Sequence, residues 1–120
     1  MTKIQNKIYD LEDRTREFAI NVRKFLKKLP KTISNIEDGK QVVRSSGSVG
    51  ANYIEANEAL SKKDFKMRIK ISRKEAKESS YWLKIIVVNN DVRFEAEGRA
   101  LIQEAEELKK IFCSILEKSK

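Results

Sequence analysis

The fold class is decided by residues 61–90, SKKDFKMRIKISRKEAKESSYWLKIIVVNN. Small and apolar side chains recur there at intervals of three and four residues, which places them on one face of an α-helix. They are Phe65, Ile69, Ser72, Ala76, Ser79 or Ser80, Leu83, and Ile86 or Val87. Ser61 and Asp64 stand at the spacing of a capping box, and residues 89–91, Asn-Asn-Asp, are typical of a turn. The segment therefore predicts one long helix.

The same spacing occurs in three flanking segments. The first carries Leu11, Thr15, Phe18, Val22, Phe25, Leu26 and Leu29, followed by the helix-ending Pro30. The second carries Val42, Ser46, Val49, Tyr53, Ala56 or Asn57, and Leu60, and its core positions are unusually small. The last carries Leu101, Ala105, Leu108, Ile111, Phe112, Ile115 and Leu116. We predict helices over residues 10–29, 37–60, 62–89 and 94–117.

Length and turn composition agree with a single helical domain over residues 1–120. A chain of 120 residues has room for one core, and its four Gly and one Pro are too few for an all-β fold. Four amphipathic helices joined by short connections bury their apolar stripes best as antiparallel neighbours. The predicted fold is an all-α, antiparallel, up-down-up-down four-helix bundle.

The charge balance favours an anionic partner. The chain has 26 Lys and Arg against 18 Asp and Glu, a net charge of +8, which attracts polyanions; the alternative is that these charges serve solubility alone. Residues 1–10 contain Lys3 and Lys7 but no apolar run of signal-peptide length, and no segment approaches the ~20 apolar residues of a membrane span. Cys113 lies among apolar neighbours and is predicted to be buried and unpaired. We expect a soluble cytoplasmic protein that does not bind membranes.

The strongest local charge signal lies between Lys62 and Lys77, a segment that contains eight basic residues and only two acids. Six of these cations fall within an arc of about 100° on the predicted helix. They are Lys63, Lys66, Lys70, Arg73, Lys74 and Lys77. Such a row can track a phosphate backbone, so RNA or DNA is a candidate ligand. The alternative is neutralisation by residues 91–107, which hold six acids and two basic residues.

The same helix has more apolar side chains than one bundle interior needs. Met67, Ile71, Trp82 and Ile85 cluster about 130° from the core stripe. A homo-oligomer interface is the predicted use, and wide core packing is the alternative. Since the Tyr and Trp residues mostly stand at core or interface spacing, few stacking platforms for nucleic-acid bases are expected.

A polar strip in the second helix is the remaining candidate cluster. It consists of Arg44, Ser48, Asn52 and Glu55, beside the small residues 45–51. The structural interpretation is a hydrogen-bonded seam between helices, and the functional one is a recognition or catalytic cluster. Residues 45–51 lack the Gly-Lys-Ser/Thr ending of a P-loop. With no His and one Cys, the chain has few groups for acid–base or metal chemistry, so we predict no enzyme, metal or cofactor.

Several fragments carry a family resemblance. They are Arg44-Ser45, Ser48-Val49-Gly50-Ala51-Asn52, Glu55-Ala56, Ser61-Lys62-Lys63-Asp64-Phe65, Lys74-Glu75-Ala76-Lys77-Glu78, Tyr81-Trp82-Leu83, Glu104-Ala105 and Glu107-Leu108. Together they resemble the bacterial four helix bundle protein family, also called the 23S rRNA-intervening sequence protein family, from about Asp10 onward. The resemblance implies an antiparallel bundle that forms a ring-like homo-oligomer, a pentamer. A more distant similarity is to accessory proteins of diversity-generating retroelements.

Two functions from different classes follow from these observations. In the first, an oligomeric, non-enzymatic module contacts RNA phosphates through the basic helix face without reading sequence. In the second, the chain is a protein–protein adaptor that binds no nucleic acid, and its charges serve solubility and docking. A third interpretation, a hydrolase in the bundle core, needs inward-facing paired carboxylates, for which Glu55 and Glu75 are the few candidates.

Overall fold

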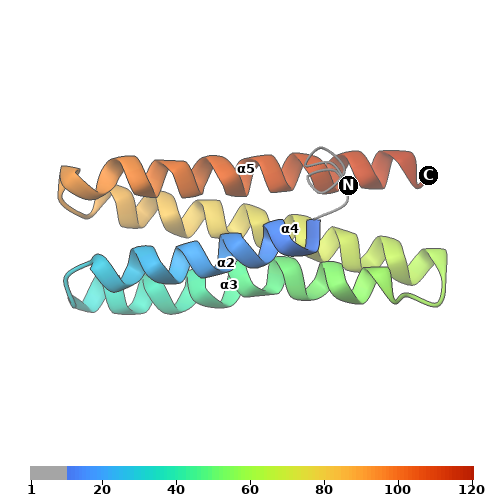
Figure 1. The fold of residues 1–120 in the computed structure, drawn as a ribbon, viewed down its shortest axis with the longest axis horizontal. Coiled ribbons are helices and arrows are strands. Elements are labelled where there is room, and N and C mark those ends of the chain that lie inside the picture. The colour runs from blue at the N-terminus through green and yellow to red at the C-terminus, as the bar shows by residue number, and fades with distance from the viewer. Residues whose placement is uncertain (1–10) are drawn as a thin grey trace, which may run out of the picture.

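The structure, a computed structural model, describes residues 11–120. The prediction about residues 1–10, including the start of the first helix at residue 10, lies outside the described residues. The described elements are α2 (Leu11–Lys28), α3 (Ile33–Asn57), α4 (Lys62–Val88), the 3-10 helix η1 (Val92–Phe94) and α5 (Glu95–Lys118) (Figure 1). This part of the chain contains no strand, so the predicted all-α class is confirmed.

The four α-helices run antiparallel to their neighbours in the chain. The α2–α3 and α4–α5 turns lie at one end of the bundle, and the α3–α4 turn and the C-terminus lie at the other (Figure 1). α3 packs against α2 and α4, α4 packs against α3 and α5, and a thinner contact between α5 and α2 closes the fourth side. The up-down-up-down bundle is therefore confirmed. None of the described helices combines the length and the apolar character needed to cross a bilayer.

The bounds of α3 differ most from the prediction. It begins at Ile33 rather than at residue 37, because the Thr32 side chain accepts the Asn35 backbone N–H at 3.1 Å and caps the helix. It ends at Asn57, so Leu60, predicted as the last core position of this series, lies in the turn and is fully exposed. α4 begins at Lys62 as predicted, with Ser61 Oγ accepting from the Asp64 N–H at 3.0 Å.

The core combines large side chains from α2 and α5 with small ones between α3 and α4. Phe18, Phe25 and Phe112 are among its largest fully or almost fully buried members. Between α3 and α4, the Ser45 and Ser79 hydroxyls are 2.8 Å apart and share a hydrogen bond. Residues 45–51 lie inside α3 and not in a loop, in agreement with the rejection of a phosphate-binding loop.

Gly98, in the first turns of α5, allows this helix to approach its neighbours closely. A Cβ at this position would lie 2.3 Å from Val87 Cγ2 and 3.2 Å from Phe25 Cζ. Overpacking of this kind costs about 1–3 kcal/mol, against about 1 kcal/mol gained from helix propensity. We therefore expect Gly98→Ala to lower the free energy of unfolding by roughly 1 kcal/mol. Urea denaturation monitored by circular dichroism measures this change.

Gly47 in α3 supplies the matched control. A Cβ there would meet only Arg23 Nη2, at 3.4 Å, and a flexible guanidinium can move aside. Gly47→Ala should therefore stabilise the protein by up to about 1 kcal/mol, because alanine has a higher helix propensity than glycine. Equal stabilisation by both substitutions would contradict close packing at Gly98.

Candidate nucleic-acid interface

α4 is held on two sides and open on the third. Toward α3, its carboxylates Glu75 and Glu78 pair with Arg44 at 3.5 and 3.0 Å. Toward α5, Ser80 Oγ donates a hydrogen bond to Glu106. Since an α-helix turns 100° per residue, these contacts leave the face between them directed away from the bundle.

The six predicted cations lie on this open face, which we call the basic face of α4. It consists of Lys63, Lys66, Lys70, Arg73, Lys74 and Lys77. Lys66 and Arg73 are half-buried, and the other four are exposed. Within residues 11–120, none of the six makes an ion pair or a side-chain hydrogen bond. These six cations are therefore not held by direct contacts with carboxylates of the described residues.

The local acids of α4 point elsewhere. Glu75 is almost fully buried against α3, and its Oε1 has no hydrogen-bond partner there apart from the longer contact with Arg44. Glu78 receives a hydrogen bond from Arg44 Nη2 at 3.0 Å. Arg44 thus draws two carboxylates of α4 toward α3 and away from the basic face.

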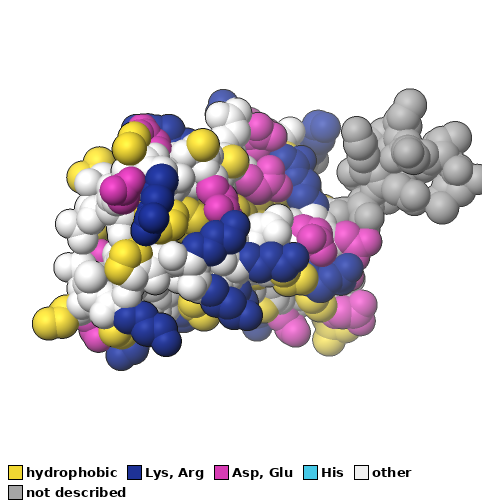
Figure 2. Space-filling model, turned by 60° about the vertical axis from the view of Figure 1, so that its left-hand side comes forward, with side chains coloured by type: hydrophobic (Ala, Val, Ile, Leu, Met, Phe, Trp, Pro, Cys, Tyr) yellow, Lys and Arg dark blue, Asp and Glu magenta, His cyan; other side chains and the backbone are white. Residues whose placement is uncertain are grey.

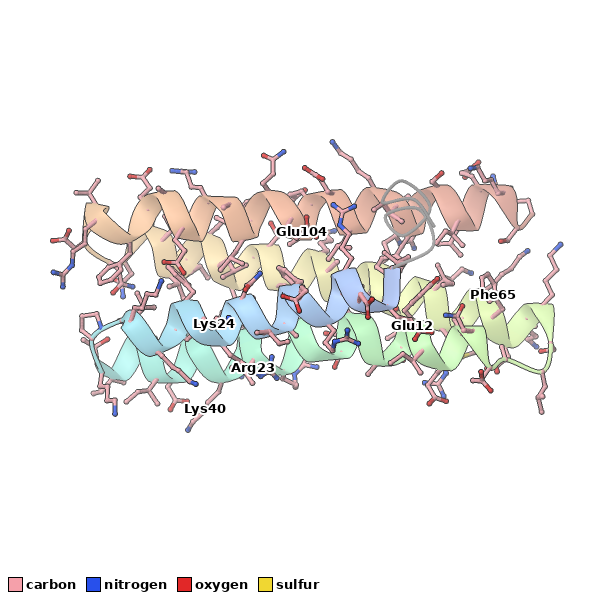
Figure 3. The ribbon with its side chains drawn as sticks, in the orientation of Figure 1. Glu12, Arg23, Lys24, Lys40, Phe65 and Glu104 are labelled. Atoms are coloured by element: carbon pink, nitrogen blue, oxygen red, sulfur yellow. The ribbon has the colours of Figure 1, made fainter. Side chains whose placement is uncertain are left out.

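The acidic start of α5 pairs mainly with α2. Arg14 Nε and Nη2 donate to Glu104 at 2.7 and 2.9 Å, and Nη2 also donates to Glu107 at 2.9 Å. Glu104 lies on α5 beside the first turns of α2 (Figure 3). The hydrogen bond to Glu104 raises the pKa of Arg14 above its ordinary value. Hydrogen bonds from Gln103 and then Arg14 lower the pKa of Glu107. At the other end of this contact, Lys28 pairs with Glu97 at 2.9 Å.

One carboxylate of α5, Glu106, reaches α4. The hydrogen bond from Ser80 lowers its pKa most, and Lys109 and Lys84 lower it further, while partial burial opposes the shift. Lys84 lies 3.7 Å from Glu106 and follows the basic face along α4, seven residues beyond Lys77. The acids of residues 91–107 therefore form no ion pair with the six cations, although Glu106 pairs with Lys84 of the same helix as those cations.

The apolar residues assigned to an oligomer interface are only partly accessible. Met67 is 53% exposed, whereas Ile71 and Ile85 are half-buried. Trp82 is also half-buried and packs against the core. Sequence reasoning missed Tyr81, which is 57% exposed and forms an edge contact with Trp82. Its signal was present: Tyr81 follows Lys77 by four residues and so lies on the same side of the helix.

The predicted polar seam faces α4 through two of its four members. Arg44 makes the ion pairs described above, and Asn52 Oδ1 accepts from Arg68 at 3.1 Å. Asn52 Nδ2 donates to the Ser48 carbonyl at 2.9 Å, a bond within α3. Glu55 is exposed and has no ion-pair partner among residues 11–120.

No group of three or more acidic or Cys side chains in these residues is placed to hold a metal ion.

A groove of about 720 Å³ separates α2 from α5. Phe18, Ala100 and Leu101 are among its apolar lining residues, and Lys24 and Lys27 lie on its rim.

Cys113, predicted to be buried, is partly exposed on α5 because it lies beside the core stripe rather than on it. Figure 2 shows that one end and side of the bundle carry side chains of both charges.

These features define a four-helix bundle with one long helix face of cations that form no ion pair in residues 11–120. The chain belongs to the 23S rRNA-intervening sequence protein family, whose sequence pattern matches residues 7–114. It is also similar to the crystal structure of a protein of unknown function from the S23 ribosomal protein family of Bacteroides thetaiotaomicron VPI-5482. The two chains are 30% identical with a TM-score of 0.74, over 88% of this chain and 96% of the other. No curated protein matches the sequence.

Proposed function

We propose that this protein is a non-enzymatic module that binds RNA phosphates through the basic face of α4. The observation that supports this proposal is the set of six cations on one helix face without a carboxylate partner in residues 11–120. Unpaired surface cations gain most from a polyanion, because no intramolecular ion pair must be broken and bound counterions are released. The description of the family, which names 23S rRNA, favours RNA over DNA.

The dimensions of the basic face suit a nucleic-acid strand. Lys63 and Lys77 are fourteen residues apart, which corresponds to about 21 Å along the helix axis. A row of this length can contact several phosphates of one RNA strand. The flexible amines contact phosphates as point charges and carry little base specificity. We therefore expect sequence-tolerant binding.

Salt dependence tests the proposal directly. Fluorescence anisotropy would follow binding of labelled RNA between about 50 and 200 mM salt. With six phosphate contacts, the slope of log K against log salt should be about −4 to −5, a loss of roughly 250- to 1000-fold over this range. The same sequence as DNA gives the comparison strand.

A flat salt dependence, or no binding of either strand at the lowest salt, would reject the proposal. The second result would favour the protein–protein adaptor, which requires no phosphate contacts. Self-association through Met67, Ile71, Trp82 and Ile85, including the pentameric ring, stays a prediction. Sedimentation of the wild type and of Met67→Glu tests it separately from RNA binding.

A further inference from the structure

An exposed aromatic ring lies one helical turn beyond the last cation of the basic face of α4, on the same side of the helix. Tyr81 and Lys63 are eighteen residues, or five helical turns, apart and so share one angular position on α4. Lys77 precedes Tyr81 by one turn, and Lys84 follows it by three residues. The Tyr81 side chain is 57% exposed, although solvent exposure of a large aromatic group is unfavourable. Its hydroxyl has no hydrogen-bond partner among the described residues.

Trp82 holds this ring in place. The ring centroids of Tyr81 and Trp82 are 5.0 Å apart and the rings are inclined by 80°, an edge-to-face arrangement. Trp82 is itself packed against the core. In an edge-to-face pair, at least one face of the Tyr81 ring stays clear of Trp82. The result is a braced aromatic surface with amines on both sides along the helix.

We propose that Tyr81 is a stacking platform for an unpaired nucleobase, so that α4 prefers single-stranded or loop RNA to duplex RNA. This inference rests on the proposed function. Bases stack on exposed aromatic side chains irrespective of their identity, whereas bases inside a duplex have no free face. Lys77 and Lys84 would contact the phosphates on either side of the stacked nucleotide. Lys84 can do so because its pairing with Glu106, at 3.7 Å, is weak.

The test compares oligoadenylate with the same strand in a duplex. Tyr81→Ala should weaken binding of the single strand by about tenfold, and Tyr81→Phe should retain it, because stacking needs the ring and not the hydroxyl. Binding of the duplex should not change in either variant. The slope of affinity against salt should also be unchanged, because no charge is altered.

Trp82 provides a second readout, since it is the single tryptophan of the chain and adjoins Tyr81. Oligoadenylate should change its emission in the wild type and in Tyr81→Phe, and much less in Tyr81→Ala. Equal loss of single-strand and duplex binding in Tyr81→Ala, or no loss in either, would overturn the stacking platform. Failure of the wild type to bind any RNA would instead reject the proposed function.

Discussion

Reversing four charges on the basic face should weaken RNA binding by about a hundredfold or more at physiological salt. The variant carries Glu at Lys66, Lys70, Arg73 and Lys74. Each lost phosphate contact removes about 0.7–0.9 from the slope of log K against log salt, and the new carboxylates repel the phosphates. Because these cations form no ion pair in residues 11–120, binding of phosphates need not break an intramolecular pair in the wild type. Anisotropy titrations at matched salt measure the loss.

A matched control separates a specific face from net charge. Its variant carries Glu at Lys24, Lys27, Lys31 and Lys40, all exposed, and lowers the net charge by the same amount. Lys24 and Lys40 lie on α2 and α3 rather than on α4 (Figure 3). The control should lose much less affinity than the α4 variant. Equal losses would mean that long-range attraction by the whole protein, and not α4, governs binding.

Both charge variants should remain folded. Surface substitutions away from buried networks usually change stability by less than about 0.5 kcal/mol. Lys66 and Arg73 are half-buried, so part of their stems packs against the protein, and a somewhat larger change is expected there. Thermal unfolding of all variants is therefore required before affinities are compared.

The sequence was most informative about α4. Its apolar period and its cap at Ser61 predicted the helix to within one residue, and Ile69, Ala76 and Leu83 are fully buried as predicted. Leu60 was misassigned because apolar spacing continues past the end of α3. Ser61 must adopt an extended conformation to cap α4, so the chain leaves the helix before Leu60.

The electrostatic environment of the basic face was not predictable from the sequence. Spacing shows which charges share a helix face, but it does not show which neighbouring helix that face meets. The acids of α5 pair largely with Arg14 and Lys28 because α5 contacts α2 on that side. Spacing places Tyr81 on the side of Lys77, but it does not show how far the ring is exposed or that the ring contacts Trp82 edge to face.

The contact that closes the bundle between α2 and α5 centres on Phe25. Its side chain is fully buried and its ring lies against Gly98 of α5, next to the Lys28–Glu97 ion pair. Phe25→Ala should therefore lower the free energy of unfolding by about 3–5 kcal/mol and the melting temperature by roughly 10–20 °C. Calorimetry or urea denaturation measures the loss.

Phe65→Ala is the control for Phe25→Ala, since Phe65 is half-buried near the α3–α4 turn (Figure 3). A site open to water leaves no closed cavity, so this control should lose only about 1–2 kcal/mol.

Gly98→Ala should cost less in the Phe25→Ala background than in the wild type, because the new methyl group can enter space vacated by the ring. The remaining cost comes from Val87, which still lies within 2.3 Å of the added Cβ. A coupling energy of about 0.5–1 kcal/mol is expected, and strict additivity would contradict direct packing of Phe25 on Gly98.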